Sequence, residues 1–435
     1  MKILLDNIGI ISMSGGKAYI KNAYLIIEGQ YIKEVGEGSA PVGDYDQVID
    51  GHDQVVLPGF INTHTHAAMT LLRGYADDMP LMEWLENKIW PLEAKLTADD
   101  VYWGTMLAIS EMIRSGTVCF ADMYFFMDAA ARAVEKSGIR AVLSRGMVGV
   151  GPENEIAFAE SREMVDKWHN ACNGRITCRL GPHAPYTCPP DYLERVINLS
   201  DELGVGLHIH IAETRGEFED IQRIYGNTPV VHLDKLGLFE RPVLGAHCVH
   251  ITPEDIAILA AKQVGVAHNP ESNMKLASGI APVQQMLDAG IRVALGTDGA
   301  SSNNNLDMLQ EMRSASYLQK VHLMDPTAIP AYQALQMATT NGAIALGLDH
   351  EIGQLKPGYK ADMIIVSFKQ PHMLPVYDPI ANIVYSAQAS DIETLIVDGN
   401  ILMQDRIIKA FDEEEVLAKA RETAQKLGVT GGRGC

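Results

Sequence analysis

A chain of 435 residues, 47% of them hydrophobic and 21% charged, has the composition of a globular protein rather than of a disordered one. Its formal net charge of -20 argues against nucleic-acid phosphates or an anionic membrane as partners. We therefore expect a soluble protein that acts on small molecules.

The apolar run at the N-terminus is broken by Asp6 and Asn7, too early for a signal peptide. No apolar run approaches the roughly 18 residues that a bilayer span requires. The six cysteines form neither a Cys-x-x-Cys pair nor a dense framework. We therefore expect reduced thiols and a cytoplasmic location.

Residues 1–57 are predicted to form short strands joined by tight turns. The segment 24–35 is typical of a β-hairpin with Gly29 in its turn. The predicted secondary-structure pattern changes at Pro58, where short apolar strands begin to alternate with longer helical segments. Such alternation indicates parallel β/α units.

Eight strands are predicted in this middle region, at 60–66, 117–123, 140–146, 176–183, 206–213, 243–247, 265–268 and 291–298. Two Thr-x-x-Asp capping boxes, at Thr97 and Thr252, are predicted to open helices between them. Eight repeats over residues 58–352 favour a closed (β/α)8 TIM barrel of the α/β class over an open sheet.

From about Gly353 the sequence again predicts short strands joined by tight turns. Strands are predicted at 361–366 and 394–402, the second with an Asp-Gly turn, and a helix at 413–427 with Asp412 as its N-cap. Each end of the chain is too short to bury a sheet face alone. We therefore predict that residues 1–57 and 353–435 form one small β-sandwich domain, including the C-terminal helix, beside a catalytic barrel of residues 58–352.

Polar side chains gather where the barrel strands are predicted to end, which is where barrel enzymes carry their chemistry. His64 and His66 are spaced i, i+2 and so point to one face of their strand. Of the 14 histidines, five lie at the ends of strands one, four, five and six, and Asp298 ends strand eight. These strand-end histidines are His64, His66, His183, His210 and His247.

Together His64, His66, His210 and Asp298 offer three neutral imidazoles and one carboxylate. That set suits Zn²⁺ or a similar divalent ion with a position left for water, whose pKa such an ion lowers from near 16 to about 7. Glu213, three residues beyond His210, is placed to reach substrate and to shuttle protons.

Several neighbouring residues have a structural interpretation instead. His208 shares a face with His210 but lies deeper, which favours a hydrogen-bonded core histidine. His183 follows Gly-Pro and could close a turn, although its neighbours favour a functional role. Cys248 is interpreted as a small buried residue, because thiolate ligands usually come in sets.

At these residues the chain resembles the amidohydrolase superfamily, in particular its mononuclear purine and pyrimidine deaminases. The resemblance extends over the full length and includes the segments 58–66, 210–213, 296–299 and 353–362, together with His247. More narrowly, the chain is similar to the 5-methylthioadenosine/S-adenosylhomocysteine deaminases. The narrower match is carried by Trp-Pro-Leu-Glu at 90–93, Ser-Arg-Gly-Met at 144–147, Gly-Pro-His-Ala-Pro-Tyr at 181–186 and the segment 268–276.

The resemblance implies a role for each site residue. His64, His66, His210 and Asp298 would bind one metal ion, most simply zinc, with iron, nickel or manganese as alternatives. His247 would hydrogen-bond the hydrolytic water. Strand four offers no lysine for a second, bridged metal. The family also suggests a homo-oligomer, a dimer or a tetramer.

For substrate binding, the resemblance implies that Glu93 holds the ribose hydroxyls and that His183 faces the nucleoside. Arg145 would lie near the thioether or homocysteine end, or reach a neighbouring subunit's site. A second arginine of the family has no clear counterpart here, and Arg162 is a loose candidate. The preference between the two named substrates therefore stays open.

The implied reaction is hydrolytic deamination at purine C6. Asp298 would take a proton from water while Glu213 protonates the ring nitrogen, giving ammonia and an inosine derivative. Adenosine and 5'-deoxyadenosine are further candidate substrates. The alternatives are a guanine or cytosine deaminase, a triazine hydrolase, or a non-catalytic ligand-binding barrel. A non-catalytic barrel should lack at least one ligand or acid/base residue, and none is missing.

Overall fold

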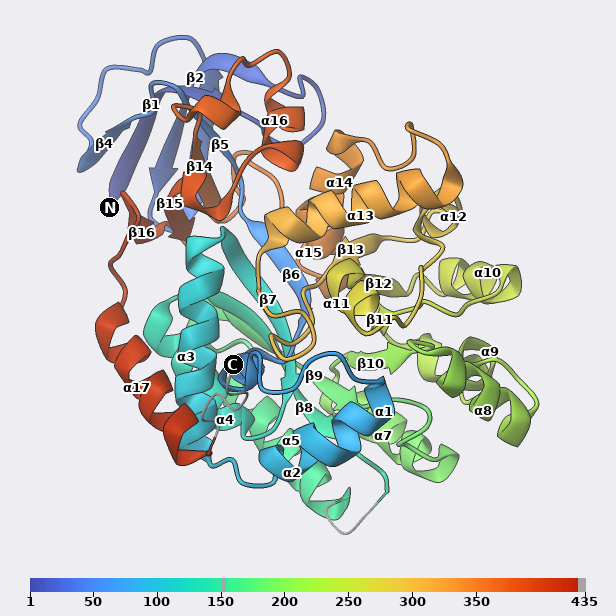
Figure 1. Ribbon diagram of the computed structural model, residues 1–435. Coiled ribbons are helices and arrows are strands. Elements are labelled where there is room, and N and C mark those ends of the chain that lie inside the picture. Colours follow the sequence, from blue (N-terminus) through green and yellow to red (C-terminus); the bar gives the residue numbers. More distant parts are fainter. Residues whose placement is uncertain (151–153, 429–435) are drawn as a thin grey trace, which may run out of the picture.

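Two β-sheets organise the protein in the computed structural model, which describes residues 1–150 and 154–428. One is an eight-stranded parallel sheet and the other a nine-stranded sheet built from both ends of the chain (Figure 1). Within the described ranges, none of the helices combines the length and apolar character needed to cross a membrane.

The parallel sheet contains all eight predicted strands, paired in chain order. They are β6 (Phe60–Thr65), β7 (Thr117–Tyr124), β8 (Arg140–Met147), β9 (Ile176–Pro182), β10 (Leu207–Ile211), β11 (Val243–His247), β12 (Gly265–His268) and β13 (Val293–Leu295). Helices alternate with them, as the (β/α)8 TIM barrel prediction requires. Both predicted capping boxes form, at the N-termini of α3 and α10.

The helices around the barrel are α3 (Ala98–Arg114), α4 (Met127–Ser137), α5 (Asn154–Trp168), α7 (Pro190–Leu203), α8 (Arg215–Tyr225), α9 (Pro229–Lys235), α10 (Pro253–Ala261), α11 (Pro270–Lys275), α12 (Val283–Asp288), α13 (Met308–Leu323), α14 (Ala331–Ala338) and α15 (Thr340–Leu346).

Side chains close the barrel between its first and last strands. Asn62 Nδ2 donates to Thr297 Oγ1 at 2.7 Å and its Oδ1 accepts from Thr297 N at 3.0 Å. Thr63 Oγ1 donates to Leu295 O at 2.8 Å, and Asp298 N donates to His64 O at 2.9 Å. Because these side chains replace part of the backbone ladder, β13 ends at Leu295, earlier than predicted. The same seam sets His64 beside Asp298.

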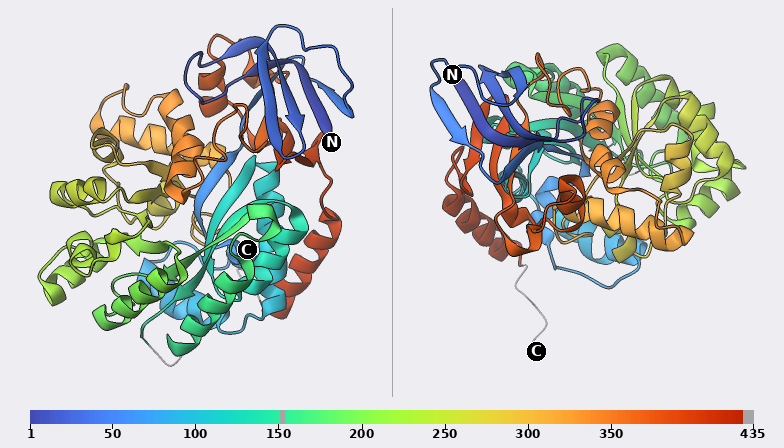
Figure 2. Two further views of the ribbon diagram at one scale, coloured as in Figure 1. Left: turned by 180° about the vertical axis from the view of Figure 1, so that it is seen from behind. Right: turned by 90° about the horizontal axis from the view of Figure 1, so that it is seen from above.

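The nine-stranded sheet joins the two ends of the chain. Its strands are β1 (Lys2–Ile10), β2 (Ile20–Glu28), β3 (Tyr31–Glu37), β4 (Gln47–Asp50), β5 (Gln54–Pro58), β14 (Met363–Ser367), β15 (Ile392–Val397), β16 (Asn400–Gln404) and β17 (Ile407–Ile408). Strand β5 pairs with β1 on one side and with β14 on the other. Figure 2 shows the N-terminal and C-terminal strands side by side in both views. The predicted hairpin at Gly29 is confirmed.

This terminal sheet curls around a core of its own. Ile32 N donates to Tyr359 O, and Ala361 N donates to Gln30 O, so β3 lies beside the residues that lead into β14. The enclosed core draws on β1, β2, β5, β14 and β15 and includes Leu5, Leu25, Val56, Ile365 and Ile396. The predicted sandwich is therefore one continuous sheet that folds over on itself.

The C-terminal helix α17 (Glu413–Lys426) leaves this sheet and lies along α3 of the barrel (Figure 1). Asp412 caps it as predicted, accepting from Glu414 N and Glu415 N. Lys426 Nζ lies 3.0 Å from Asp100 Oδ1 on α3. The division of the chain into two domains, with boundaries at residues 57 and 353, stays a prediction.

A buried ion pair fastens the barrel to the terminal sheet. Arg140, at the start of β8, is 1% exposed, and its Nε lies 2.8 Å from Asp362 Oδ2. Its Nη2 lies 3.4 Å from Asp398 Oδ1, in the turn between β15 and β16. Lys360 Nζ supplies Asp398 with a second cation at 3.2 Å. One guanidinium thus holds two carboxylates from the other sheet.

Replacing Arg140 with methionine will destabilise the protein strongly, because both carboxylates then stay buried with too little positive charge. We expect the free energy of unfolding to fall by ~3–5 kcal/mol, measured by urea denaturation. The control is Arg162→Met, since Arg162 forms an exposed pair with Glu202 and should change little. An Arg140→Met variant as stable as the control would show that the ion pairs of Arg140 with Asp362 and Asp398 do not stabilise the fold.

Candidate active site

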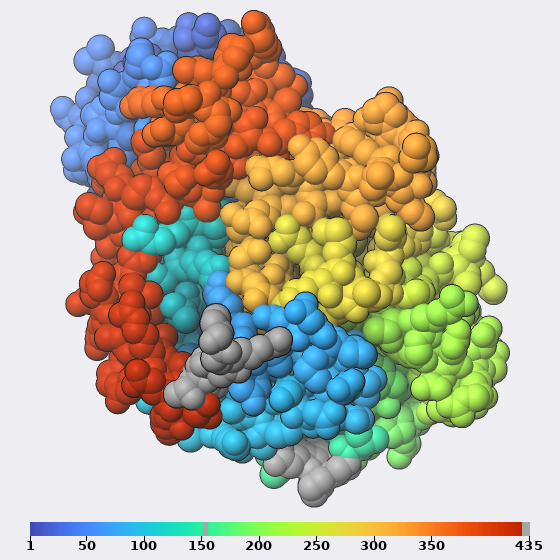
Figure 3. Space-filling model, in the orientation of Figure 1, coloured from blue at the N-terminus to red at the C-terminus, as the bar shows by residue number. Residues whose placement is uncertain are grey.

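A cavity of about 510 Å³ opens at the C-terminal ends of the barrel strands. Its walls include all but one of the predicted site residues, namely His66, Glu93, Arg145, His183, His210, Glu213, His247 and Asp298; His64 lies beneath them, fully buried. The segment with α1 (Leu81–Trp84), η2 (Leu85–Ile89) and α2 (Trp90–Glu93) contributes Leu81, Trp84, Leu85 and Trp90 to the lining. This light-blue segment lies across the front of the molecule in Figure 3.

His66 and His210 point their Nε2 atoms at each other. His66 Nδ1 lies 2.6 Å from Met123 O, and His210 Nδ1 lies 2.7 Å from His183 O. A carbonyl only accepts, so both Nδ1 atoms carry a proton, and in the neutral imidazole both Nε2 atoms present a lone pair. The two Nε2 atoms are 3.4 Å apart. In this neutral form neither Nε2 can donate to the other, and the pair suits a cation between them.

His64 and Asp298 complete the same centre. His64 Nδ1 contacts His208 Nε2 at 2.9 Å, while His64 Nε2 is buried without a hydrogen-bond partner among the described residues. Asp298 Oδ1 lies 3.4 Å from His64 Nε2 and 3.3 Å from His66 Nε2. Burial lowers the pKa of His64 to about 4, so its ring is neutral at pH 7. An orphaned imidazole nitrogen beside a carboxylate fits a divalent metal ion.

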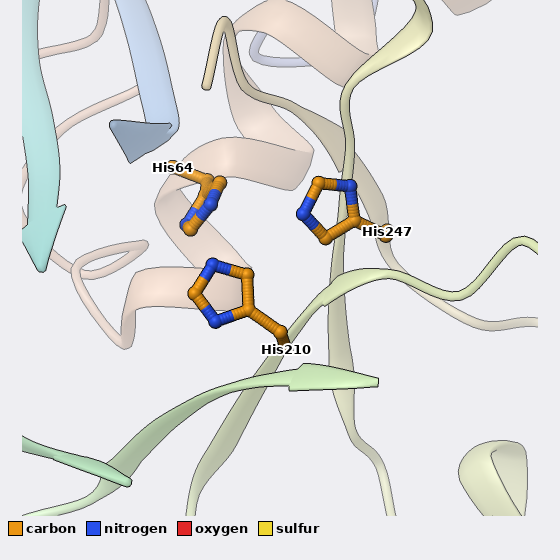
Figure 4. A group of neighbouring side chains, drawn as sticks. All are labelled: His64, His210 and His247. Atoms are coloured by element: carbon orange, nitrogen blue, oxygen red, sulfur yellow. The ribbon is translucent and has the colours of Figure 1, made fainter. Parts of the chain in front are cut away.

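His247 is held by the side chains of two asparagines. Its ring faces those of His64 and His210 (Figure 4), and it lies close enough for the three to form a ligand group by distance alone. The side-chain amides of Asn269 and Asn273 contact His247 Nδ1 at 3.2 and 3.0 Å. These contacts fix the ring so that His247 Nε2 lies 3.7 Å from Glu213 Oε2.

Asp298 is held as an anion by its neighbours. Its backbone is left-handed, with φ of 60°, and Ser272 Oγ and Ser302 Oγ donate to its Oδ2 at 2.7 and 3.2 Å. Burial alone would raise the pKa of Asp298, but the neighbouring imidazoles of His64, His247 and His66 outweigh it and hold the pKa well below its usual value.

Glu213 lies at the cavity wall outside the converging set. Its Oε2 is 3.7 Å from His247 Nε2, and Ser278 Oγ donates to its Oε1 at 3.4 Å. Burial, with a contribution from the charge of Asp298, raises the pKa of Glu213 to about 8. Glu217 fixes the turn by accepting from the backbone N–H groups of Ala212 and Glu213, both at 2.9 Å. A protonated carboxyl group is thus aimed into the cavity.

The predicted substrate-binding residues line the cavity farther out. Tyr124 OH donates to Glu93 Oε1 at 2.7 Å, and burial raises the pKa of Glu93 to about 7. His183 Nδ1 contacts Thr187 Oγ1 at 2.8 Å, and its ring centroid lies 4.8 Å from that of His210. Arg145, from the end of β8, contacts Glu160 and the Gly146 carbonyl.

The predicted role of His208 as a hydrogen-bonded core histidine is confirmed, since it is buried against His64. Three other residues that orient the site, Glu217, Asn269 and Asn273, are not predicted from the sequence. The two asparagines lie in the resemblance segment 268–276, which is the signal that could have pointed to partners of a strand-end histidine.

Comparisons with known proteins agree with this fold. The model of the amidohydrolase family matches residues 55–402. The 5-methylthioadenosine/S-adenosylhomocysteine deaminase of Syntrophomonas wolfei is 70% identical, over 98% of this chain and 99% of its own. The relative of the same name from Desulforamulus reducens is 54% identical over the same shares of the two chains.

Solved structures give the same picture. An adenosine deaminase from Xanthomonas campestris with bound zinc superposes with a TM-score of 0.94 at 33% identity, over 98% of this chain and 99% of that one. An atrazine chlorohydrolase from Arthrobacter aurescens, 24% identical with a TM-score of 0.90 over 97% and 100% of the two chains, shares the fold. The chain belongs to the amidohydrolase family. Within that family it groups, over its full length, with relatives named 5-methylthioadenosine/S-adenosylhomocysteine deaminase.

Metal analysis of the purified protein will find about one divalent ion per chain, because one set of acceptor atoms converges. His66→Ala should reduce the bound metal to a small fraction, since it removes one of the facing Nε2 atoms. His322→Ala, which changes an exposed histidine on α13, should keep the full content. Full metal occupancy in the His66→Ala protein would exclude this residue from the centre.

Proposed function

We propose that the protein is a metal-dependent hydrolase that deaminates adenosine-type nucleosides, 5-methylthioadenosine and S-adenosylhomocysteine, to the matching inosine derivatives. One observation carries the proposal. The nitrogens of His64, His66 and His210 converge with Asp298, while Glu213 stays outside this set on the cavity wall. The relatives at 54–70% identity that carry this activity in their name support the substrate class.

In this proposal His64, His66, His210 and Asp298 hold one divalent ion. A bound ion of this kind acidifies water and so supplies a nucleophile at neutral pH. The zinc in the 33% identical adenosine deaminase structure favours zinc as that ion. His208, Met123 O and His183 O would each fix the orientation of one imidazole ring.

Side chains of the protein carry out the proton transfers of the reaction. Asp298 accepts a proton from the attacking water, and Glu213 donates one to the ring nitrogen beside C6. His247 donates a hydrogen bond through Nε2 to the oxygen that adds to C6. Asp298 then passes its proton to the amino group, the C6–N bond breaks and ammonia leaves. The proton of the C6 hydroxyl group returns to Glu213 as the carbonyl of the inosine derivative forms, so water has replaced the amine. Each proton transfer lowers the barrier at a poor nucleophile or a poor leaving group.

The nucleoside would extend from the metal end toward Glu93. A partly buried carboxyl group held by Tyr124 suits paired ribose hydroxyls, and His183 lines the wall beside the base. A cavity of about 510 Å³ accommodates a ligand of nucleoside size. Guanine, cytosine and triazine hydrolysis are the alternatives within the same fold, and they make no use of a ribose-binding carboxyl group.

Glu213→Gln will leave the metal bound but lower kcat by roughly 10²–10⁴-fold, because the amide cannot donate a proton as an acid. The loss is measured as the absorbance change on deamination of 5-methylthioadenosine, with metal content determined on the same sample. The matched control is Glu219→Gln, an exposed change on α8. Turnover of the Glu213→Gln protein at the wild-type rate would remove this residue from the mechanism.

Glu93→Ala will separate a nucleoside deaminase from a free-base deaminase. We expect kcat/KM for 5-methylthioadenosine to fall by roughly 10²-fold, since the ribose hydroxyls lose the carboxyl group that accepts their hydrogen bonds. Glu86→Ala, an exposed change in the same segment, should have no such effect. Equal activity of wild type and Glu93→Ala, or efficient deamination of guanine or cytosine by both, would favour the free-base alternative.

A further inference from the structure

The wall of the cavity can be followed outward from the metal centre through aromatic contacts. The ring centroid of Tyr124 lies 6.4 Å from that of His66, and the Phe125 ring lies 5.2 Å from the Tyr124 ring. Arg145 Cζ lies 5.2 Å from the centroid of Phe125. Arg145 therefore lies at the other end of this row of rings from His66, and in the proposed binding mode the nucleoside's 5' substituent reaches this part of the cavity, which we term its far end.

This far end is mostly apolar. Phe125 lies beside Arg145, and the apolar residues of the lining include Val148, Val150 and Ala157, from the segments that follow Arg145 in the chain. Among the cavity-lining residues of the described ranges, Arg145 is the only arginine and there is no lysine. Arg162, the other candidate cation, does not line the cavity and pairs with Glu202 at 2.7 Å on the surface.

An ion pair with Glu160, which lies outside the cavity lining, offsets the charge of Arg145. Its side chain is 8% exposed, and its Nε donates to Glu160 Oε2 at 2.7 Å. Its Nη1 donates to the carbonyl of Gly146. Glu160 is 43% exposed and lies on α5 one turn beyond Ala157, and it is not among the residues that line the cavity. A substrate in the cavity therefore meets a guanidinium group whose charge a carboxylate outside the cavity offsets.

We propose that Glu160 determines specificity: by pairing with Arg145 it makes the far end of the cavity favour small uncharged 5'-thioethers over the zwitterionic amino-acid end of S-adenosylhomocysteine. The inference rests on the proposed deaminase function and narrows its substrate class. An incoming carboxylate would have to compete with Glu160 for one cation, and it would lose its hydration among apolar side chains. A methylthio group has neither cost.

The test compares three substrates in wild type and Glu160→Gln. They are 5-methylthioadenosine, S-adenosylhomocysteine, and the adenosine 5'-thioether that carries an aminopropyl chain with no carboxylate. Glutamine can still accept a hydrogen bond from Arg145, so the guanidinium stays in place while the neutralising charge is removed. Glu163→Gln, an exposed change on the same helix, controls for net charge.

We expect wild type to prefer 5-methylthioadenosine over S-adenosylhomocysteine by roughly tenfold or more in kcat/KM. Glu160→Gln should reduce this ratio by roughly tenfold, the size of one charge-assisted hydrogen bond, through a lower KM for S-adenosylhomocysteine. Its use of 5-methylthioadenosine and of the aminopropyl thioether should not improve, and Glu163→Gln should behave as wild type.

Three results would overturn the inference. Wild type could prefer S-adenosylhomocysteine, or Glu160→Gln could leave the ratio unchanged. Glu160→Gln could also lose activity toward both amine-bearing substrates, which would make Glu160 a receptor for the ammonium group. Failure of the proposed function looks different, because the metal-loaded wild type would then deaminate none of the three nucleosides.

Discussion

The site depends on a set of acceptor atoms that face one another with no donor between them. The Nε2 atoms of His66 and His210 lie 3.4 Å apart, and Asp298 Oδ1 lies within 3.4 Å of both His64 and His66. Lone pairs at such distances repel, and in a buried setting the repulsion is poorly screened. A cation converts every one of these contacts into an attraction. Met123 O and His183 O accept from the Nδ1 atoms of His66 and His210. Neither ring can therefore relieve the repulsion by moving its proton from Nδ1 to Nε2.

The closure of the barrel and the construction of this site use the same contacts. Asn62 and Thr63, two and one residues before His64, bind Thr297 and Leu295 with their side chains, and Asp298 N donates to His64 O. Gly296 permits the close approach, since a Cβ atom there would lie 2.8 Å from His64 N. The first and last strands therefore cannot separate without moving a histidine and its carboxylate partner apart.

The sequence allowed the strands and the strand-end residues to be predicted, because both follow from local patterns. Alternation along β6 puts His64 and His66 on one face, and an apolar run marks each strand whichever partner it has. Ring orientation could not be predicted in this way. The ring of His247 is held by Asn269 and Asn273, which follow it by 22 and 26 positions and meet it only after β11 and β12 pair.

Contacts across the fold limited the prediction of the outer cavity as well. Arg145 and Glu160 lie 15 residues apart, on a strand and on the helix that follows it, and no periodic pattern joins them. The family resemblance could therefore suggest an arginine near the substrate's thioether end, which stays a prediction, but it could not say that the charge of this arginine is offset.

Stability and chemistry occupy opposite ends of the barrel. Phe60 and Arg140 stand at the starts of their strands, where Arg140 contacts Asp362 and where Ile364 and Ile392 of the terminal sheet pack close to Gly116. The cavity lies at the other ends of the same strands. A strand such as β8 thus carries its anchoring residue, Arg140, at one terminus and the cavity residue Arg145 at the other. The terminal sheet can hold the barrel rigid without contributing a side chain to the cavity, which leaves the loops at the open end free to set substrate preference.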